Sequence, residues 1–276
     1  MTSTNFNLQS KTVLITGGAG FLGSHFAASL LQNDCTVVIS DLCSDSLAFA
    51  KDKLKHLFPD GRLHTVVLDV TSQSSIIEAS QKLDSLSLNV DTLINNAAIN
   101  PKVDGDGLLS NPSRLENFEL DSWNQEINVG LTGAFLCTKV FGEKMAQNGF
   151  GNIINIASDL AVIAPNQSIY ATPGISEQDQ NKKPVTYSVI KHGLVGLTKY
   201  TATYWADKNV RCNSLSPGGV FNSQDPLFVE RLTSLIPLQR MCELRDLEGA
   251  IQFLCSDASS YMNGHNLVLD GGRSIW

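Results

Sequence analysis

The sequence predicts an α/β fold in which helices cover both faces of a doubly wound, parallel, seven-stranded sheet. Short β-rich runs alternate with longer segments of helical period, and most of these segments are long enough for the crossover helix that parallel strands require. The runs are almost continuously apolar, as expected for strands that are covered on both faces. The expected strands are residues 12–16, 36–40, 64–68, 91–95, 152–157, 210–215 and 266–270.

Length and composition predict one domain over residues 1–276. A chain of 276 residues that is 42% hydrophobic can bury a full core, and no linker-like segment or internal repeat divides it. The formal net charge of -7 opposes attraction to nucleic acid or anionic lipid. Residues 1–11 lack the apolar stretch of a signal peptide, and no run approaches the ~18 apolar residues of a membrane span. We therefore expect a cytoplasmic protein that binds neither nucleic acid nor membrane.

The cysteines predict neither a disulfide framework nor a metal site. No C-x-x-C pair occurs, and no histidine stands near a cysteine at metal-ligand spacing. We expect reduced, buried thiols at all six positions. They are Cys35, Cys43, Cys137, Cys212, Cys242 and Cys255.

A glycine-rich turn follows the first expected strand. Within "TGGAGFLG" (16–23), Gly18, Gly20 and Gly23 fit the pattern G-x-G-x-x-G, and Gly17 adds a fourth permissive position. Glycines let the backbone turn tightly, let a pyrophosphate approach the following helix, and let that helix pack closely on the strand. Because the pattern lies between a strand and an amphipathic helix, it predicts a dinucleotide site.

Asp41 closes the second expected strand, 18 residues beyond Gly23. An acid at this position can accept hydrogen bonds from the hydroxyls of an adenosine ribose. No lysine or arginine follows it before Lys51, so a 2'-phosphate would meet repulsion. The sequence favours NAD over NADP. The alternative is that Asp41 only caps the next helix.

Tyr187 and Lys191 share one helix face in "PVTYSVIKHG" (184–193). An ammonium group one turn from a phenol stabilises the phenolate and lowers the tyrosine pKa when the pair is partly removed from water. The pair can therefore serve in acid-base catalysis. The alternative is an exposed pair without a function.

A series of further motifs occurs in one order along the chain: "LDVTS" (68–72), "INNAAIN" (94–100), "WNQEINVGLTG" (123–133), "NIINIAS" (152–158), "YSVIK" (187–191), "VRCNSLSPGG" (210–219) and "VLDGG" (268–272). With "TGGAGFLG" they resemble the short-chain dehydrogenase/reductase family over about residues 11–273. The resemblance implies the Rossmann fold of the compact, single-domain type. A narrower resemblance is to oxidoreductases encoded with bacterial surface-glycan and flagellin-modification genes.

The resemblance implies four catalytic residues. Tyr187 would exchange a proton with the substrate oxygen, and Lys191 would lower the pKa of the phenol and bind the nicotinamide ribose. Ser158 would orient and polarise the carbonyl or carbinol. Asn128 would hold a water that links Lys191 to solvent. Taken alone, Ser158 and Asn128 could instead be a helix cap and a polar residue inside a helix.

The resemblance also implies an NAD site along the ends of several strands. Asn95 is expected to line its cofactor side while it satisfies backbone groups. The other expected cofactor residues are Gly17, Gly18, Gly20, Phe21, Leu22, Gly23, Asp41, Leu42, Asp69, Val70, Asn96, Ala97, Ala98, Tyr187, Lys191, Pro217, Gly218 and Val220.

The chain departs from the compact branch at three points. Its glycines also fit T-G-x-x-G-x-x-G, a spacing typical of the larger nucleotide-sugar branch. Asn222 stands where a threonine often contacts the carboxamide. Ser158 and Tyr187 are 29 residues apart, about twice the usual separation.

Three loops are expected to surround the substrate, at about residues 100–120, 159–184 and 219–236. Lys102 and Arg114 in the first loop could anchor a carboxylate or phosphate. Neutral polar side chains in the second loop suit a polyhydroxylated ligand better than an acyl chain. They are Asn166, Gln167, Ser168, Tyr170, Thr172 and Gln178.

These features predict an NAD-dependent oxidoreductase that acts on a secondary alcohol or ketone, with a sugar or sugar derivative as substrate. Three alternatives stay open: a 3-oxoacyl thioester reductase, a nucleotide-sugar epimerase or dehydratase, and a non-catalytic NAD-sensing protein. The helix around Tyr187 is apolar over much of its circumference. Because the family pairs this helix between subunits, we expect a homodimer or homotetramer.

Overall fold

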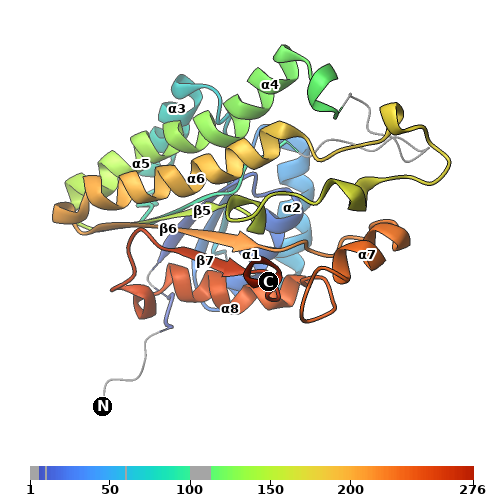
Figure 1. Cartoon of the computed structure of the whole chain (residues 1–276). Coiled ribbons are helices and arrows are strands. Elements are labelled where there is room, and N and C mark those ends of the chain that lie inside the picture. The colour runs from blue at the N-terminus through green and yellow to red at the C-terminus, as the bar shows by residue number, and fades with distance from the viewer. Residues whose placement is uncertain (1–5, 10, 60, 100–112) are drawn as a thin grey trace.

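The computed structural model describes residues 6–9, 11–59, 61–99 and 113–276. Seven parallel strands form one sheet in the order β3-β2-β1-β4-β5-β6-β7 (Figure 1). All seven expected strands are confirmed, with shifts of no more than a few residues at their ends. They are β1 (Thr12–Thr16), β2 (Thr36–Asp41), β3 (Leu63–Val67), β4 (Thr92–Asn95), β5 (Gly151–Ile156), β6 (Val210–Pro217) and β7 (Asn266–Leu269).

Helices cover both faces of this sheet, which confirms the doubly wound arrangement. Helices α1, α2 and α8 pack on one face, and α3, α5 and α6 pack on the other. In the view of Figure 1, α5 and α6 lie above the sheet and α8 lies below it. The helices are α1 (Phe21–Leu31), α2 (Ser44–Leu57), α3 (Gln73–Ser85), α4 (Leu120–Ile127), α5 (Gly133–Asn148), α6 (Val185–Tyr204), α7 (Pro226–Thr233) and α8 (Leu244–Cys255).

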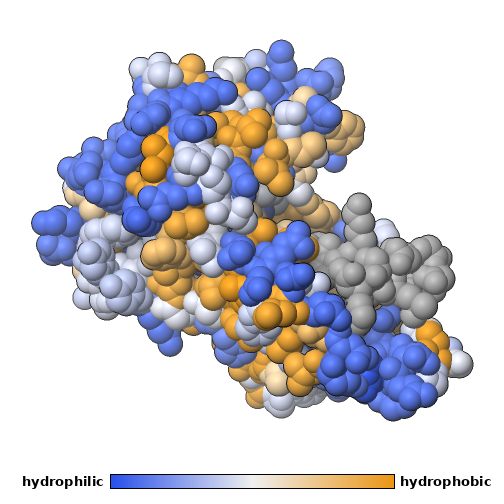
Figure 2. All heavy atoms as spheres, turned by 90° about the horizontal axis from the view of Figure 1, so that it is seen from above, coloured by the Kyte–Doolittle hydropathy of each residue, from blue (hydrophilic) through white to orange (hydrophobic). Residues whose placement is uncertain are grey.

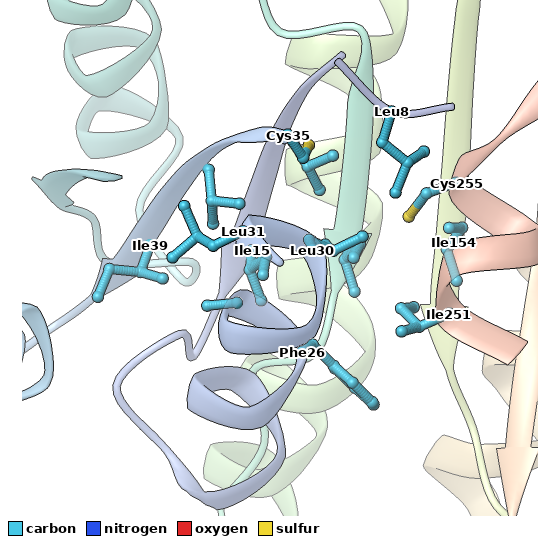
Figure 3. Packing of buried hydrophobic residues seen from close by; sticks show 14 of the residues in the cluster. Leu8, Ile15, Phe26, Leu30, Leu31, Cys35, Ile39, Ile154, Ile251 and Cys255 are labelled. Carbon is cyan, nitrogen blue, oxygen red and sulfur yellow. The ribbon is translucent and has the colours of Figure 1, made fainter. Parts of the chain in front are cut away.

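The core between α1, α8 and the sheet is closely packed. Phe26 and Leu30 of α1 lie near Ile251 of α8 and contribute to one cluster with Ile15 and Ile154 of the strands (Figure 3). All five side chains are fully buried. Burial of side chains of this size stabilises the fold by roughly 1.5–3 kcal/mol each. This core fixes α1, and therefore the glycine turn before it, against the sheet.

The strand order reverses at β1, which pairs with β2 on one side and β4 on the other. In open parallel sheets, the loops after two such strands run in opposite directions and leave a crevice at the carboxyl ends. The chain next to this crevice comes from Gly17 after β1 and Asn96 after β4, and Asn96 Nδ2 donates to the Gly17 carbonyl at 3.1 Å. The fold therefore places a ligand site where the glycine turn lies.

The loop between β5 and α6 is an ordered insert that packs on α7. It contains three 3-10 turns, at Asp159–Ala161, Gln167–Tyr170 and Glu177–Asp179. The Tyr170 ring lies 5.5 Å from the ring of Phe228 on α7. Two of the three expected substrate loops, 159–184 and 219–236, thus contact each other.

The cysteines are all free, but they are not all buried. Cys35, Cys137, Cys212 and Cys255 are buried as expected, whereas Cys43 is exposed at the start of α2. The expectation of six buried thiols was therefore wrong, because Cys43 follows the end of β2 and lies outside the packed layers. No helix in the described part of the chain is long and apolar enough to cross a membrane.

Candidate active site

A cavity of about 700 Å³ lies at the carboxyl ends of the strands. Its wall includes Gly17 after β1, Asp41 at the end of β2, Asn96 after β4, Ser158 after β5 and Pro217 at the end of β6. Ser158 and Asp41 come from strands on opposite sides of β1 and β4. The cavity is therefore long enough to bring a catalytic group and a cofactor-binding group into one space.

The glycine turn shapes one end of the cavity. Gly17 has φ +61°, and a Cβ there would lie 2.8 Å from Ala97 Cα. A Cβ at Gly23 would lie 2.3 Å from the Gly17 oxygen, and a Cβ at Gly18 would lie 2.7 Å from Ile39 Cβ. Gly17 and Gly20 line the cavity, whereas Gly18 and Gly23 do not. Gly17 lets the turn pack against Ala97, and Gly18 and Gly23 let α1 begin close to the strand and the turn.

Asp41 lies in the cavity wall next to this turn. Its Oδ2 accepts a hydrogen bond from Ala19 N at 3.3 Å, and its Oδ1 accepts one from Leu42 N at 2.9 Å. The helix that follows is capped at Cys43, and no Asp41 bond to its first turn occurs in the described residues. The arrangement therefore does not support the alternative in which Asp41 only caps α2.

Most of the other expected cofactor residues also line the cavity. The members of this group are Phe21, Leu22, Leu42, Val70, Asn96, Ala97, Ala98, Pro217, Gly218 and Val220.

Asp69 and Asn95 lie elsewhere. Asp69 Oδ1 accepts from the Thr71 amide and hydroxyl, which turns its carboxylate toward its own loop. Asn95 is buried, and its Nδ2 donates to Thr138 at 3.0 Å and to Asn155 at 2.8 Å. The expectation that Asn95 lines the cofactor side was wrong, because its side chain points into the sheet and links β4 to β5 and α5.

Ser158, Tyr187 and Lys191 all line the cavity, as expected of groups that act together. Ser158 follows β5, and the other two project from the first turns of α6. Lys191 Nζ donates to the Ile156 carbonyl at 2.7 Å and lies 5.6 Å from the centroid of the Tyr187 ring. The hydrogen bond to the Ile156 carbonyl holds the Lys191 ammonium group beside Tyr187.

The pKa of Tyr187 shifts in the direction opposite to the one expected. Burial raises the pKa of this phenol, the hydrogen bond with Ser158 opposes the rise, and the charge of Asp159 adds to it. Burial and, to a smaller extent, the nearby charge of Lys183 together lower the pKa of Lys191 to about 8. Removal from water therefore outweighs the attraction between ammonium and phenolate. The phenol stays protonated over a wide pH range.

Asn128 does not reach the cavity wall. It is exposed and begins a π-helical segment, Asn128–Thr132, between α4 and α5. Such segments often mark functional sites, because they break the regular hydrogen-bond pattern of a helix. The structure thus brings together three of the four expected catalytic residues, and the role of Asn128 as a water holder stays a prediction.

A buried ion pair that the sequence analysis did not find lies beside Ser158. Arg273 Nη1 donates to Asp159 Oδ2 at 2.7 Å, and the side chains of the pair are 7% and 3% exposed. Asp159 Oδ1 also accepts from the Ser158 hydroxyl at 2.8 Å. Asp270 fixes the turn before Arg273 by accepting from the amides of Gly272 and Ser274. The motif "VLDGG" thus ends one residue short of a cavity residue.

Lys183 is a second cavity residue that the sequence analysis missed. Its Nζ lies 3.6 Å from the centroid of the Tyr187 ring. Lys183 and Lys191 each stand four residues from Tyr187, so the sequence did contain a signal. The helical pattern points only to the lysine inside the helix, and Lys183 comes just before the helix begins.

The expected substrate residues behave differently from one another. Among the neutral polar side chains of the insert, only Tyr170 lines the cavity. Other side chains of this group stabilise the insert by internal hydrogen bonds. For example, Gln167 Oε1 accepts a hydrogen bond from Lys183 N at 2.8 Å. Arg114 pairs with Glu116 at 2.5 Å and donates to the Glu177 carbonyl at 2.6 Å. Lys102 lies outside the described residues. Arg114 thus holds the insert in place and does not line the cavity.

Comparison with known proteins identifies the family. The family model described as enoyl-(acyl carrier protein) reductase matches residues 18–274. The 3-oxoacyl-(acyl-carrier-protein) reductase of Thermotoga maritima is 29% identical over 97% of this chain and 99% of its own length. The 2-dehydro-3-deoxy-D-gluconate 5-dehydrogenase of Bacillus subtilis is also 29% identical, over 97% and 96%. The flagellin modification protein A of Campylobacter coli is 27% identical, over 97% and 100%. The chain is thus about as similar in sequence to relatives with other activities as it is to the flagellin modification protein.

Solved structures agree over the whole chain. The short-chain dehydrogenase of Leptospira borgpetersenii with bound NAD+ has a TM-score of 0.83 and 31% identity, and it covers 100% of this chain and 98% of its own. The gluconate 5-dehydrogenase of Burkholderia cenocepacia, in complex with NADP and tartrate, has a TM-score of 0.83 and 26% identity, with 98% of each chain covered. The chain belongs to the short-chain dehydrogenase/reductase family of oxidoreductases, as a compact member built on a single parallel sheet.

Proposed function

We propose that the protein is an NAD-dependent dehydrogenase or reductase that interconverts a secondary alcohol and a ketone on a sugar or sugar derivative. The observation that carries this proposal is the cavity that joins the glycine turn and Asp41 at one end to Ser158, Tyr187 and Lys191 at the other. A cofactor-sensing protein without turnover would need only the end of the cavity that holds the glycine turn and Asp41.

The residues of this chain fit a dinucleotide. Gly17 lets the turn pack against Ala97 with a positive φ, and Gly20 lies at the N-terminus of α1, where backbone amides attract a pyrophosphate. Asp41 suits ribose hydroxyls, and the remaining cations of the described cavity wall, Lys183, Lys191 and Arg273, come from later parts of the chain. This distribution supports NAD over NADP. The bound nicotinamide supplies or accepts a hydride.

The protein side chains then manage the proton and the substrate oxygen. Tyr187, protonated because burial raises its pKa, donates its proton to the forming alkoxide during reduction and receives it during oxidation. Ser158 supplies a hydroxyl close to the same oxygen. Lys191, held at the Ile156 carbonyl, provides positive charge beside Tyr187. This assignment keeps Tyr187 and Lys191 in both the catalytic and the cofactor-binding groups.

The wall next to Tyr187 supports a polar substrate. The cavity wall that holds Tyr187 also includes the charged side chains of Asp159, Lys183 and Arg273 and the apolar side chains of Phe228 and Met241. An acyl chain gains nothing from the charged groups, whereas a sugar can bond to them and rest on the apolar ones. The names of the relatives also include sugar-acid dehydrogenases. A 3-oxoacyl thioester reductase is the second candidate, because a relative of that name is equally similar.

The function is tested by incubating the purified protein with NAD+ or NADH and a panel of polyols, sugar acids, ketoses and acetoacetyl thioesters. We expect a change in NADH absorbance with members of the sugar panel. Turnover restricted to the acetoacetyl thioester would establish the second candidate instead. No turnover with any member, combined with tight NAD binding, would favour a sensing protein.

Cofactor choice has its own test in Asp41→Ala. The parent protein should bind NADH more tightly than NADPH, because the Asp41 carboxylate would face a phosphate dianion. Asp41→Ala should lower the ratio of the NADPH Kd to the NADH Kd by about 10-fold, because one charge-assisted contact with NADH is lost and one repulsion of NADPH is relieved. Fluorescence titration of both cofactors measures the effect. Equal or tighter NADPH binding by the parent would contradict the assignment.

We further propose a cytoplasmic homodimer or homotetramer. Helices α5 and α6 expose apolar and aromatic side chains, among them Phe135, Val189, Tyr200 and Tyr204. Seen from above, hydrophobic patches interrupt the hydrophilic surface (Figure 2). Pairing would cover such patches. Light scattering should give a mass of at least twice the 29.9 kDa of one chain, and the mass of a single chain at micromolar concentration would refute the proposal.

A further inference from the structure

Lys183 occupies an unusual position among the charged side chains of the protein. Its ammonium group lies against the ring of Tyr187, at 3.6 Å from the ring centroid, and the residue forms part of the cavity wall. In the described part of the chain, no carboxylate lies within 4.0 Å of Lys183 Nζ, and Nζ donates no hydrogen bond to a protein group. Among the described residues, this charge therefore contacts the Tyr187 ring and has no ionic or hydrogen-bonding partner.

The surrounding charges leave this part of the cavity with a positive surplus. Asp159 is the acid with the largest electrostatic effect on Lys183, but its carboxylate is already engaged by Arg273 and Ser158. Glu126 of α4 acts on Lys183 more weakly, and its carboxylate accepts from the Thr186 hydroxyl. Lys191 adds a further positive charge on the same side. With the pair at Asp159 neutral as a whole, Lys183 is the cavity cation without an ionic partner among residues 6–9, 11–59, 61–99 and 113–276.

Such a position is costly for a lysine that has no binding role. Burial lowers the pKa of Lys183, the charges of Asp159 and Glu126 oppose this shift, that of Arg273 adds to it, and the resulting pKa is about 8. A partly buried ammonium group without a counter-ion loses hydration and recovers little of it. An anion in the cavity would restore the lost interaction as a charge-assisted hydrogen bond.

We propose that Lys183 binds a carboxylate of the substrate, so that the enzyme acts on a sugar acid in preference to the corresponding neutral sugar. The proposal rests on the proposed function, since it names the substrate class of the same site. Lys183 lies on the ring of Tyr187, so a carboxylate bound there stands close to the group that exchanges the proton. This arrangement places the reacting hydroxyl a short distance along the same molecule.

A carboxylate matches the site better than a phosphate. One ammonium group is available, and it is a point charge with three donors, which suits a monoanion. A phosphate ester carries up to two charges and is commonly met by an arginine fork or by several cations. Here the Arg273 guanidinium is bound to Asp159, and Lys191 is bound to the Ile156 carbonyl. The available charge therefore fits one carboxylate.

The test compares two substrates that differ at one carbon. D-Gluconate and D-glucitol share their hydroxyl groups, but gluconate ends in a carboxylate where glucitol ends in a hydroxymethyl group. The parent protein with NAD+ should have the lower KM for gluconate. Lys183→Gln should raise the gluconate KM by about 10- to 100-fold, the usual range for loss of one charge-assisted bond, and leave the glucitol KM nearly unchanged.

Two further variants serve as controls. Lys182→Gln changes the neighbouring lysine, whose Nζ pairs with Glu177 at 3.1 Å outside the cavity wall, and it should leave both KM values unchanged. Lys183→Arg keeps the charge and should retain most of the preference for gluconate. Because the ammonium must be protonated to bind an anion, the gluconate KM of the parent should also rise as pH increases through about 8. Because the pKa of Lys191 is also about 8 and this residue serves both substrates, the ratio of the gluconate KM to the glucitol KM is the quantity that should rise.

Tartrate binding separates this proposal from the proposed function. Calorimetric titration of tartrate into the parent protein with bound NADH requires no turnover. Binding that is lost in Lys183→Gln and kept in Lys182→Gln supports an anion site at Lys183, even if neither gluconate nor glucitol is a substrate. Absence of tartrate binding in the parent, or equal binding in Lys183→Gln, would overturn the proposal. If Lys183→Gln kept the parental ratio of gluconate KM to glucitol KM, the anion-site proposal would be overturned as well. Turnover of either substrate would still support the proposed function.

Discussion

Replacement of Tyr187 by phenylalanine should lower kcat by at least ~100-fold, because the change removes the only atom of this side chain that can transfer a proton. The ring stays in place, so its contacts with Lys183 and Lys191 should be kept. NAD affinity should therefore change by less than about three-fold. A fall in kcat without a matching loss of NAD affinity would show that the hydroxyl acts in the transition state. Steady-state kinetics on a verified substrate and NADH titration measure the two effects.

Tyr200 provides a matched control on the same helix. It is 65% exposed, and its ring stacks on Tyr204 at 5.7 Å, far along α6 from the cavity. Tyr200→Phe removes the same hydroxyl from the same element and should leave kcat unchanged. Near-parental turnover in Tyr187→Phe would show that another group transfers the proton, and the mechanism described above would be wrong.

Replacement of Asp159 by alanine should have the largest effect on stability. The change leaves the Arg273 guanidinium buried without its counter-ion, a situation that costs about 3–5 kcal/mol in other proteins. The 3% and 7% exposure of the two side chains leaves little room for water to compensate. Urea unfolding followed by circular dichroism measures the loss in free energy of unfolding. The curves are fitted with one common m-value, the slope of the unfolding free energy against urea concentration.

Two comparisons make this result specific. Asp84 pairs with Lys144 on the surface, with side chains 55% and 38% exposed, so Asp84→Ala should cost no more than about 1 kcal/mol. The double change Asp159→Ala with Arg273→Leu should be more stable than Asp159→Ala alone, because the orphaned charge is removed as well. A loss below about 1 kcal/mol in Asp159→Ala would mean that the pair contributes like a surface pair.

The fold and the cofactor end of the site could be predicted because their determinants are local. Each strand is a short apolar run, and the glycines of the turn are required by close contacts with Ile39 of β2, with Ala97 after β4 and within the turn itself. Asp41 could be located because it closes a strand next to that turn. Parallel strands bring such strand ends to one edge of a sheet, so sequence order alone predicts which residues meet.

The substrate end could not be predicted in the same way, because it depends on contacts between distant segments. Asp159 and Arg273 are separated by 114 residues, and nothing local in either segment indicates the pair. The direction of the Tyr187 pKa depends on how completely the ring is buried, which spacing along a helix does not reveal. Polar residues of the insert could be counted, but whether they face a ligand or bind one another depends on its folded path, as Gln167 illustrates.

The position of Arg273 also bears on how the protein should be prepared for these measurements. The last turn, Arg273–Ile275, carries a cavity residue, and the Trp276 indole that follows donates to the Leu235 carbonyl at 3.1 Å. An affinity tag joined after Trp276 would start beside the cavity and could add its own histidines and carboxylates to the anion-binding measurements. Leu8, by contrast, packs near Cys35 and Cys255 before β1 begins, at the amino ends of the strands (Figure 3). A tag joined before that segment keeps foreign charge on the opposite edge of the sheet, away from Lys183.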